Sequence, residues 1–202
     1  MPEPFVRVVS AVIPILRDNI DTDQICPARY LKTTDKANLA EALFRDWRFD
    51  ADGRVRVPPF VLDTPAAAGR QIILAGDNFG AGSSREHAVW ALRAWGVRAI
   101  IAPSFADIFT GNALHNALLP IVVGGARHAA LAAELAANLD GAWVVDLEAE
   151  QVVLPGGRAF GFVLDPFARQ MILAGDDELG YVLARTGDIE AWEGAHPARV
   201  HI

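Results

Sequence analysis

Residues 76–87 limit most strongly what this chain of 202 residues can fold into. They follow the apolar run 71–75 and lead into a segment whose apolar residues share one helical face. A strand therefore leads through a glycine-containing loop to the start of a helix. Backbone N–H groups and the positive end of the helix dipole meet at such a point, and Arg85 adds a planar guanidinium that matches a carboxylate or a phosphate. The segment predicts a site for an anionic ligand.

Three common loops of this kind do not match the spacing. A P-loop ends in Gly-Lys-Ser/Thr, and residues 76–87 contain no lysine. The dinucleotide-binding fingerprint needs a third glycine where Arg85 stands, and the nucleophile elbow needs a glycine where Glu86 stands. A purely structural alternative stays open, because Ser83 and Glu86 have the spacing of a capping box that would only begin the helix.

Composition favours one domain over residues 1–202. The chain is 52% hydrophobic, which supplies a core without disulfides, and Cys26 is its one cysteine. A net charge of −7 without a basic run argues against binding to nucleic acid or to an anionic membrane. The sequence has no signal-peptide pattern and no apolar stretch long enough to cross a bilayer, so we expect a cytoplasmic protein.

Apolar patterns predict strands and helices in alternation, followed by a stretch rich in strands. Strands are expected near residues 6–13, 71–75, 98–102, 120–123, 143–147, 151–154 and 160–164. Helices are expected near residues 37–44, 84–95, 104–116 (capped by Ser104) and 127–138, with two short helical segments closing the domain at the C-terminus. Residues 50–59 are polar and contain Gly53 and Pro58-Pro59, which indicates a surface loop. The order predicts a mixed sheet flanked by helices.

Three strings extend the pattern beyond a general anion site. They are Asp18-Asn19-Ile20-Asp21-Thr22-Asp23-Gln24-Ile25, Gly82-Ser83-Ser84-Arg85-Glu86-His87-Ala88 and Ser104-Phe105-Ala106-Asp107-Ile108-Phe109-Thr110-Gly111-Asn112. In order and spacing they resemble the mobile swivel domain of the aconitase superfamily, and within it the small subunits of 3-isopropylmalate dehydratases. The resemblance runs from about residue 6 to about residue 192. It implies a three-layer β/β/α fold, which is consistent with the mixed α/β sheet expected above.

The resemblance implies a hydro-lyase that interconverts 2-isopropylmalate and 3-isopropylmalate by dehydration and rehydration in leucine biosynthesis. Aconitase-type dehydratases use a four-iron–four-sulfur cluster, and such clusters are held by several thiolates. One cysteine cannot supply them. We therefore expect no metal or cofactor in this chain. The cluster is expected on a large iron–sulfur subunit, which forms a heterodimer or heterotetramer with this chain, and the isolated chain should be inactive.

The resemblance also assigns roles to four residues. Ser83 matches the general base, an alkoxide that removes a proton from the carbon next to a carboxylate. A serine hydroxyl is a weak acid, so the helix end and nearby cations would have to stabilise that alkoxide. Ser84 and Arg85 would bind a substrate carboxylate, and Asp23 would line the cleft and position a cation there.

Five further residues are expected to support the site rather than to react: Asp21, Thr22, Glu86, His87 and Asn112. Asp21 suits the side chain-to-backbone bonds of an Asx turn. Glu86 would close the capping box with Ser83, and His87 would hold a loop carbonyl. Asn112 would anchor a loop or a helix end.

Substrate choice is expected in residues 30–34. Tyr30 and Leu31 suit an apolar isopropyl group, whereas Lys32 would favour a third carboxylate if it faces the substrate rather than solvent. The substrate class is therefore a small di- or tricarboxylic acid. Two alternatives stay open: a related hydro-lyase acting on homoaconitate or on methyl- or dimethylmalate, and an anion-binding domain that has kept the loop without the chemistry.

Overall fold

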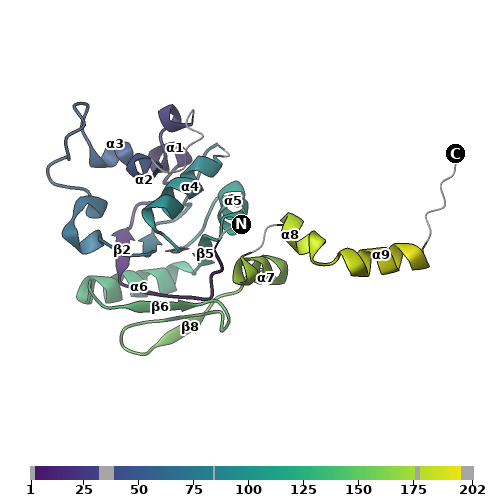
Figure 1. The fold of residues 1–202 in the computed structure, drawn as a ribbon. Coiled ribbons are helices and arrows are strands. Elements are labelled where there is room, and N and C mark those ends of the chain that lie inside the picture. The colour runs from purple at the N-terminus through teal and green to yellow at the C-terminus, as the bar shows by residue number, and fades with distance from the viewer. Residues whose placement is uncertain (1–2, 32–38, 84, 176–177, 197–202) are drawn as a thin grey trace.

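The computed structural model describes residues 3–31, 39–83, 85–175 and 178–196, and their strands form two four-stranded sheets (Figure 1). The parallel sheet has the order β2-β3-β4-β5, with bounds Val12–Ile15, Ile72–Ala75, Ala99–Ala102 and Leu119–Val122. The antiparallel sheet has the order β1-β6-β7-β8, with bounds Arg7–Ser10, Trp143–Asp146, Gln151–Val153 and Ala159–Gly161.

The parallel sheet is the middle layer of the molecule. Every residue of β3 and β4 is buried, as expected for parallel strands that are covered on both faces. Because successive side chains of a strand point to opposite faces, Ile73 packs with the helices on one side, and Ile72 packs with Trp143 of the antiparallel sheet on the other. The result is the predicted β/β/α arrangement of layers.

Nine helices are found in the described part of the chain. Their bounds are α1 Thr22–Ile25, α2 Leu39–Ala42, α3 Arg45–Arg48, α4 Glu86–Trp95, α5 Asp107–His115, α6 Gly125–Ala137, α7 Pro166–Ala174, α8 Glu178–Leu183 and α9 Thr186–Ala195. Short 3-10 turns lie at Ala28–Tyr30, Val61–Asp63 and Pro65–Ala67. Within the segment 37–44, where one helix was expected, the structure has the short helix α2, and residues 37–38 lie outside the described ranges. Helix α3 follows this segment and was not predicted. Residues 50–59 form an exposed loop, as predicted.

The single strand expected at 6–13 is two strands in different sheets. Here β1 pairs antiparallel with β6, and β2 pairs parallel with β3, so the chain crosses between the sheets at Ala11. Ser10 fixes this crossing, because its hydroxyl donates to the carbonyl of Ala11 over 2.6 Å and accepts from the N–H of Gln71 over 2.8 Å. The largely apolar pattern of residues 6–13 does not reveal such a crossing.

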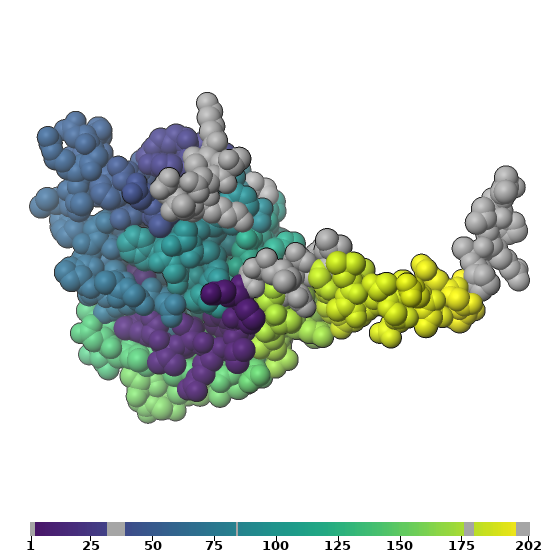
Figure 2. Space-filling view, viewed as in Figure 1, coloured from purple at the N-terminus to yellow at the C-terminus, as the bar shows by residue number. Residues whose placement is uncertain are grey.

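The expectation that the C-terminal helical segments close the domain is wrong for α8 and α9. Helix α7 does pack on the core through Ala168, Met171 and Ile172. In contrast, α8 and α9 extend away from the body of the molecule (Figures 1 and 2). None of the residues of α9, all of which the structure describes, is buried. We call the described residues 178–196 the C-terminal arm.

A buried ion pair ties α3 to the 3-10 turn at 61–63. Arg48 and Asp63 approach to 2.8 Å, and each side chain is only 8% exposed. The Arg48 guanidinium also donates to the carbonyl of Leu43 over 3.2 Å. Removing one partner of a buried pair leaves an uncompensated charge, which is costly.

We therefore expect Asp63→Asn to lower the free energy of unfolding by about 3 kcal/mol, as measured by urea denaturation. The matched control is Asp52→Asn, which breaks the exposed Arg54–Asp52 pair and should change the free energy of unfolding by less than about 0.5 kcal/mol. Equal losses in the two variants would contradict this account of the buried pair.

Candidate active site

Three loops meet at the carboxyl ends of β2, β3 and β4. Neighbouring parallel strands end at the same edge of a sheet, and ligands commonly bind there. Isolated backbone bridges join Asp21 to Ala81 and Phe79 to Phe105, so the first and third loops lie directly against the second. The three strings singled out in the sequence are thereby brought together.

Hydrogen bonds around Asp77 connect the three loops. Its carboxylate accepts a hydrogen bond from the hydroxyl of Ser104 over 2.6 Å, and its backbone N–H donates to the carboxylate of Asp18 over 2.7 Å. The Ser104 hydroxyl accepts from the N–H of Asn78 over 3.0 Å, and the Asn78 amide donates to the side-chain oxygen of Asn19 over 2.9 Å. We call these five residues the loop network. Ser104 therefore serves this network, whereas the N-cap of α5 is Ala106.

Two glycines of the second loop are required by close packing. A Cβ on Gly80, which has φ of +80°, would lie 2.2 Å from the ring of Phe109. A Cβ on Gly76 would lie 2.3 Å from the carbonyl oxygen of Arg17. Both distances are far below ordinary contact, so these glycines let the loop pass between its neighbours.

The capping box lies in a different loop from the one predicted. The Asp21 carboxylate accepts from the N–H of Gln24 over 2.7 Å, and the Gln24 side chain accepts from the N–H of Asp21 over 3.0 Å. Helix α4 begins only at Glu86, with an extended Arg85 at its N-cap that makes no capping bond to the described residues. The predicted pairing of Ser83 with Glu86 is therefore wrong. Ser83 is exposed and lies ahead of the helix.

Thr22 and Ser83 join the first two loops. The Thr22 hydroxyl donates to the backbone carbonyl of Ser83 over 2.9 Å. This bond fixes the backbone of Ser83, while its side chain stays on the exposed surface. Thr22 therefore has a supporting contact in the place where the sequence predicts one.

Arg85 forms an ion pair with Asp23 across the two loops. The Arg85 side chain is 18% exposed and that of Asp23 is 52% exposed. A mostly buried guanidinium is therefore held by a carboxylate that is open to solvent. An incoming carboxylate could take the place of Asp23, since the Arg85 fork recognises either group.

Cys26 is buried near the ion pair of Arg85 and Asp23. Burial raises the pKa of its thiol to about 11, although the positive charge of Arg85 lowers it in part. The thiol is therefore neutral at physiological pH and a poor metal ligand. Among the residues that the structure describes, no group of three or more His, Cys, Asp or Glu side chains could hold a metal ion. The neutral thiol and the lack of a ligand group among the described residues both argue against an iron–sulfur cluster held by those residues.

Glu86 and Asn112 lie on two helices that Asn116 connects. The Asn116 side chain donates to the Glu86 carboxylate over 2.9 Å and to the backbone carbonyl of Asn112 over 2.9 Å, and it accepts from the Trp90 indole over 3.0 Å. Asn112 itself lies within α5. Asn116 was marked in the sequence only by its position at the end of an expected helix.

The two histidines nearest the second loop have different contacts. The ring of His87 packs against Trp90, with 4.6 Å between the ring centroids. The carbonyl of Ala75, at the end of β3, is contacted by Nε2 of His128 over 2.7 Å. The sequence offered no pattern that would have placed His128 there.

Of residues 30–34, which were expected to determine substrate specificity, the structure describes Tyr30 and Leu31. Tyr30 lines a polar hollow of about 460 Å³ with residues of α3 and the 50–59 loop. The described residues that line this hollow do not include Ser83 or Arg85. Leu31 is partly exposed. Ser84 and Lys32 lie outside the described residues, so their roles stay predictions.

Comparison with known proteins identifies the class of domain to which this fold and these loops belong. Residues 3–125, which include all three loops, match the family model of the aconitase C-terminal domain. The crystal structure of 3-isopropylmalate dehydratase from Methanocaldococcus jannaschii aligns with a TM-score of 0.65 and 28% sequence identity, covering 92% of this chain and 98% of that one.

Curated relatives narrow the class further. The 3-isopropylmalate dehydratase small subunit of Anaeromyxobacter sp. strain K is 53% identical over 95% of this chain and 98% of its own length. The small subunit of Solibacter usitatus is 48% identical over 98% of this chain and 97% of its own length. The chain belongs to the family of 3-isopropylmalate dehydratase small subunits, within the aconitase superfamily, and the resemblance in its three strings is confirmed. No helix in the described part of the chain is long and apolar enough to cross a membrane.

The capping box formed by Asp21 and Gln24 leads to a prediction about stability. Asp21→Ala should lower the free energy of unfolding by about 1 kcal/mol, because an N-cap and its reciprocal bond are lost. Ser83→Ala should change it by less than about 0.5 kcal/mol, since Ser83 caps no helix. Urea denaturation of both variants checks this, and a larger loss for Ser83→Ala than for Asp21→Ala would contradict it.

Proposed function

We propose that this chain supplies half of the active site of a 3-isopropylmalate dehydratase, with Ser83 as the proton acceptor and Arg85 as the carboxylate-binding group. One observation carries the proposal: the exposed Ser83 lies two residues from a mostly buried guanidinium whose partner carboxylate is open to solvent. The names and near full-length similarity of the relatives support interconversion of 2-isopropylmalate and 3-isopropylmalate, a reaction of leucine biosynthesis.

Arg85 binds one carboxylate of the substrate in this proposal. In the structure Asp23 neutralises the guanidinium, which would otherwise be a buried charge without a partner. Asp23 is about half exposed, so it can turn toward water when a substrate carboxylate arrives. The exchange keeps Arg85 paired throughout and selects for an anionic substrate.

Ser83 accepts the proton from the carbon next to that carboxylate. The positive charge of Arg85 and the N-terminus of α4 lower the cost of holding a negative charge on the Ser83 oxygen. Loss of this proton and of the hydroxyl on the adjacent carbon gives an alkene and water. Addition of the proton and hydroxyl in the opposite arrangement gives the isomer, so no oxidant or reductant is needed.

The hydroxyl must leave with help from another polypeptide. An iron–sulfur cluster supplies Lewis-acid chemistry in aconitase-type enzymes, and the residues that the structure describes offer no group of ligands that fits one. We place the cluster on a large subunit, in a heterodimer or heterotetramer with this chain. The hydro-lyases for homoaconitate and for methyl- or dimethylmalate would use Ser83 and Arg85 in the same way, and turnover of a substrate panel by the complex distinguishes them.

Replacing the proton acceptor tests the chemistry. In the complex with the large subunit, Ser83→Ala should lower kcat on isopropylmalate by about 10²–10⁴-fold and leave KM within a few-fold, because only proton transfer is lost. Complex formation and the folded fraction serve as controls. Turnover within threefold of the unmodified complex would remove Ser83 from the chemistry.

A second variant pair tests the carboxylate site. Arg85→Gln should raise KM for isopropylmalate at least tenfold, since a bidentate charged contact is lost. The control Arg54→Gln removes a guanidinium from the exposed 50–59 loop and should leave KM and kcat unchanged. Similar kinetics for the two variants would show that Arg85 does not hold the substrate.

Because the proposed active site is divided between two chains, the isolated chain should be inactive. Purified alone, this chain should contain no iron by chemical analysis and should not turn over isopropylmalate, because it lacks the thiolates that hold a cluster. Adding the large subunit under anaerobic conditions should restore activity. Turnover by the isolated chain would contradict the divided site.

A further inference from the structure

The C-terminal arm stands apart from the body of the molecule (Figures 1 and 2). A contact at its root is the pair formed by Phe167 of α7 and Tyr181 of α8, whose rings meet edge to face with 4.7 Å between centroids. Beyond this contact the arm consists of a six-residue helix and a ten-residue helix. Helices this short are marginal in water unless an apolar face is packed.

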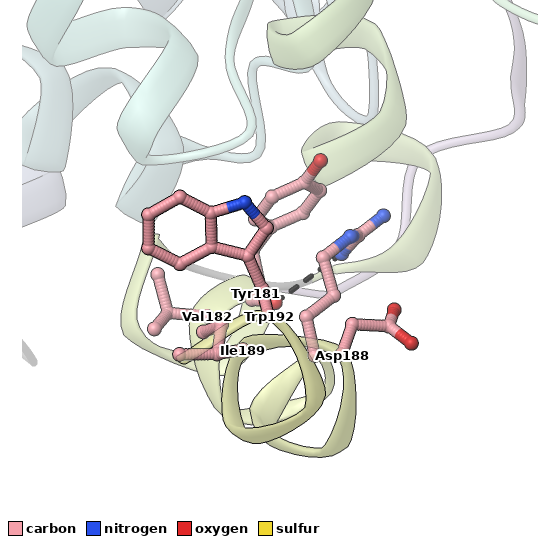
Figure 3. A pocket seen from close by; sticks show the side chains of 6 residues that line it. Tyr181, Val182, Asp188, Ile189 and Trp192 are labelled. Carbon is pink, nitrogen blue, oxygen red and sulfur yellow. Dashed lines mark hydrogen bonds between the residues drawn. The ribbon is translucent and has the colours of Figure 1, made fainter. Parts of the chain in front are cut away.

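An apolar strip runs along the arm. It contains Tyr181, Val182, Ile189 and Trp192, which with Arg185 and Asp188 enclose a hollow of about 300 Å³ (Figure 3). Tyr181 and Val182 belong to α8, whereas Ile189 and Trp192 lie three residues apart on one face of α9. All four side chains line the same hollow. Trp192 is 62% exposed and Val182 is 50% exposed. We call these four residues the arm strip.

Polar groups beside the strip cover only part of it. The Arg185 guanidinium lies 3.4 Å from the centroid of the Tyr181 ring and donates to the Tyr181 carbonyl over 3.2 Å. Asp188 points away from Val182 and Ile189 in Figure 3. The ring of His196 stacks on one face of Trp192, with 4.6 Å between the centroids, yet Trp192 and Ile189 both remain exposed. An exposed tryptophan beside a hollow is typical of the residues that dominate protein interfaces.

We propose that the arm strip docks into an apolar, basic-rimmed groove of the large iron–sulfur subunit. This inference rests on the proposed function, which requires that subunit. Relatives named as small subunits align with 98% of this chain, so their alignments include most of the 19 described arm residues, which run from 178 to 196. The arm is thus shared by chains whose common partner is a large subunit.

Charge argues against a second copy of this chain as the occupant. Around the strip, α9 carries Asp188, Glu190 and Glu193, and Arg185 lies at its N-cap. The whole chain has a net charge of −7, so self-docking would bring acidic surfaces together. A groove lined by Lys and Arg would complement the arm instead, and such rim charges mainly raise the association rate.

Docking through the arm leaves the chemistry of the three loops unchanged, because none of the arm-strip residues belongs to those loops. Loss of docking should therefore weaken the complex and leave turnover at saturating large subunit unchanged. This separates the arm from Ser83 and Arg85, whose replacement changes the kinetics of the assembled enzyme.

The test titrates the large subunit into full-length chain by calorimetry, a readout that needs no activity. Trp192→Ala should raise the Kd at least 30-fold, corresponding to about 2 kcal/mol, with kcat at saturation unchanged. The matched control Val57→Ala, which shortens an almost fully exposed side chain of the 50–59 loop, should leave the Kd unchanged. Circular dichroism confirms folding of each variant.

A charge-reversed variant provides an independent readout. Glu190→Lys combined with Glu193→Lys should slow association and reduce its dependence on salt. An unchanged Kd for Trp192→Ala would overturn the proposal, as would homodimers of the unmodified chain that dissociate on this replacement while large-subunit binding persists. A complex that forms through the arm but does not turn over isopropylmalate would contradict the proposed function and support the docking site.

Discussion

The Asp77 carboxylate and its neighbours hold three loops in one arrangement, and the candidate site depends on that arrangement. Asp18, Asn78 and Ser104 follow the ends of three adjacent parallel strands. Asp18 and Ser104 are hydrogen-bonded to Asp77, and Asn78 is hydrogen-bonded to Ser104, so the loops have little freedom to shift separately. Because β3 and β4 are buried on both faces, the platform beneath the loops is rigid. Arg85 can therefore meet Asp23 across loops that are 62 residues apart in the sequence.

Part of this arrangement could be predicted from the sequence, for physical reasons. Buried parallel strands read as continuous apolar runs, so β3 and β4 were placed within one residue of their bounds. The start of α4 was expected two residues too early, because Ser83 and Glu86 have the spacing of a capping box. Arg85 is extended in the structure and pairs with Asp23 from another loop, and local spacing does not contain that information.

The other errors have a tertiary origin as well. The crossing between sheets at Ala11 depends on which strands lie nearby, so an apolar pattern alone could not reveal it. Two short C-terminal helical segments were expected to close the domain. The structure leaves Trp192 largely exposed, and in the docking proposal a second polypeptide covers this surface. A chain that supplies half a site also needs a contact that holds it to the other half.

The central claim is that Ser83 and Arg85 act on the substrate from this chain while the cluster is carried by its partner. A crystal structure of the two-chain complex with an unreactive isopropylmalate analogue tests this claim most directly. The account predicts a substrate carboxylate on Arg85 in place of Asp23, and the Ser83 oxygen about 3 Å from the carbon that loses its proton. An intact pair between Arg85 and Asp23, with the Ser83 hydroxyl turned away from the analogue, would contradict it.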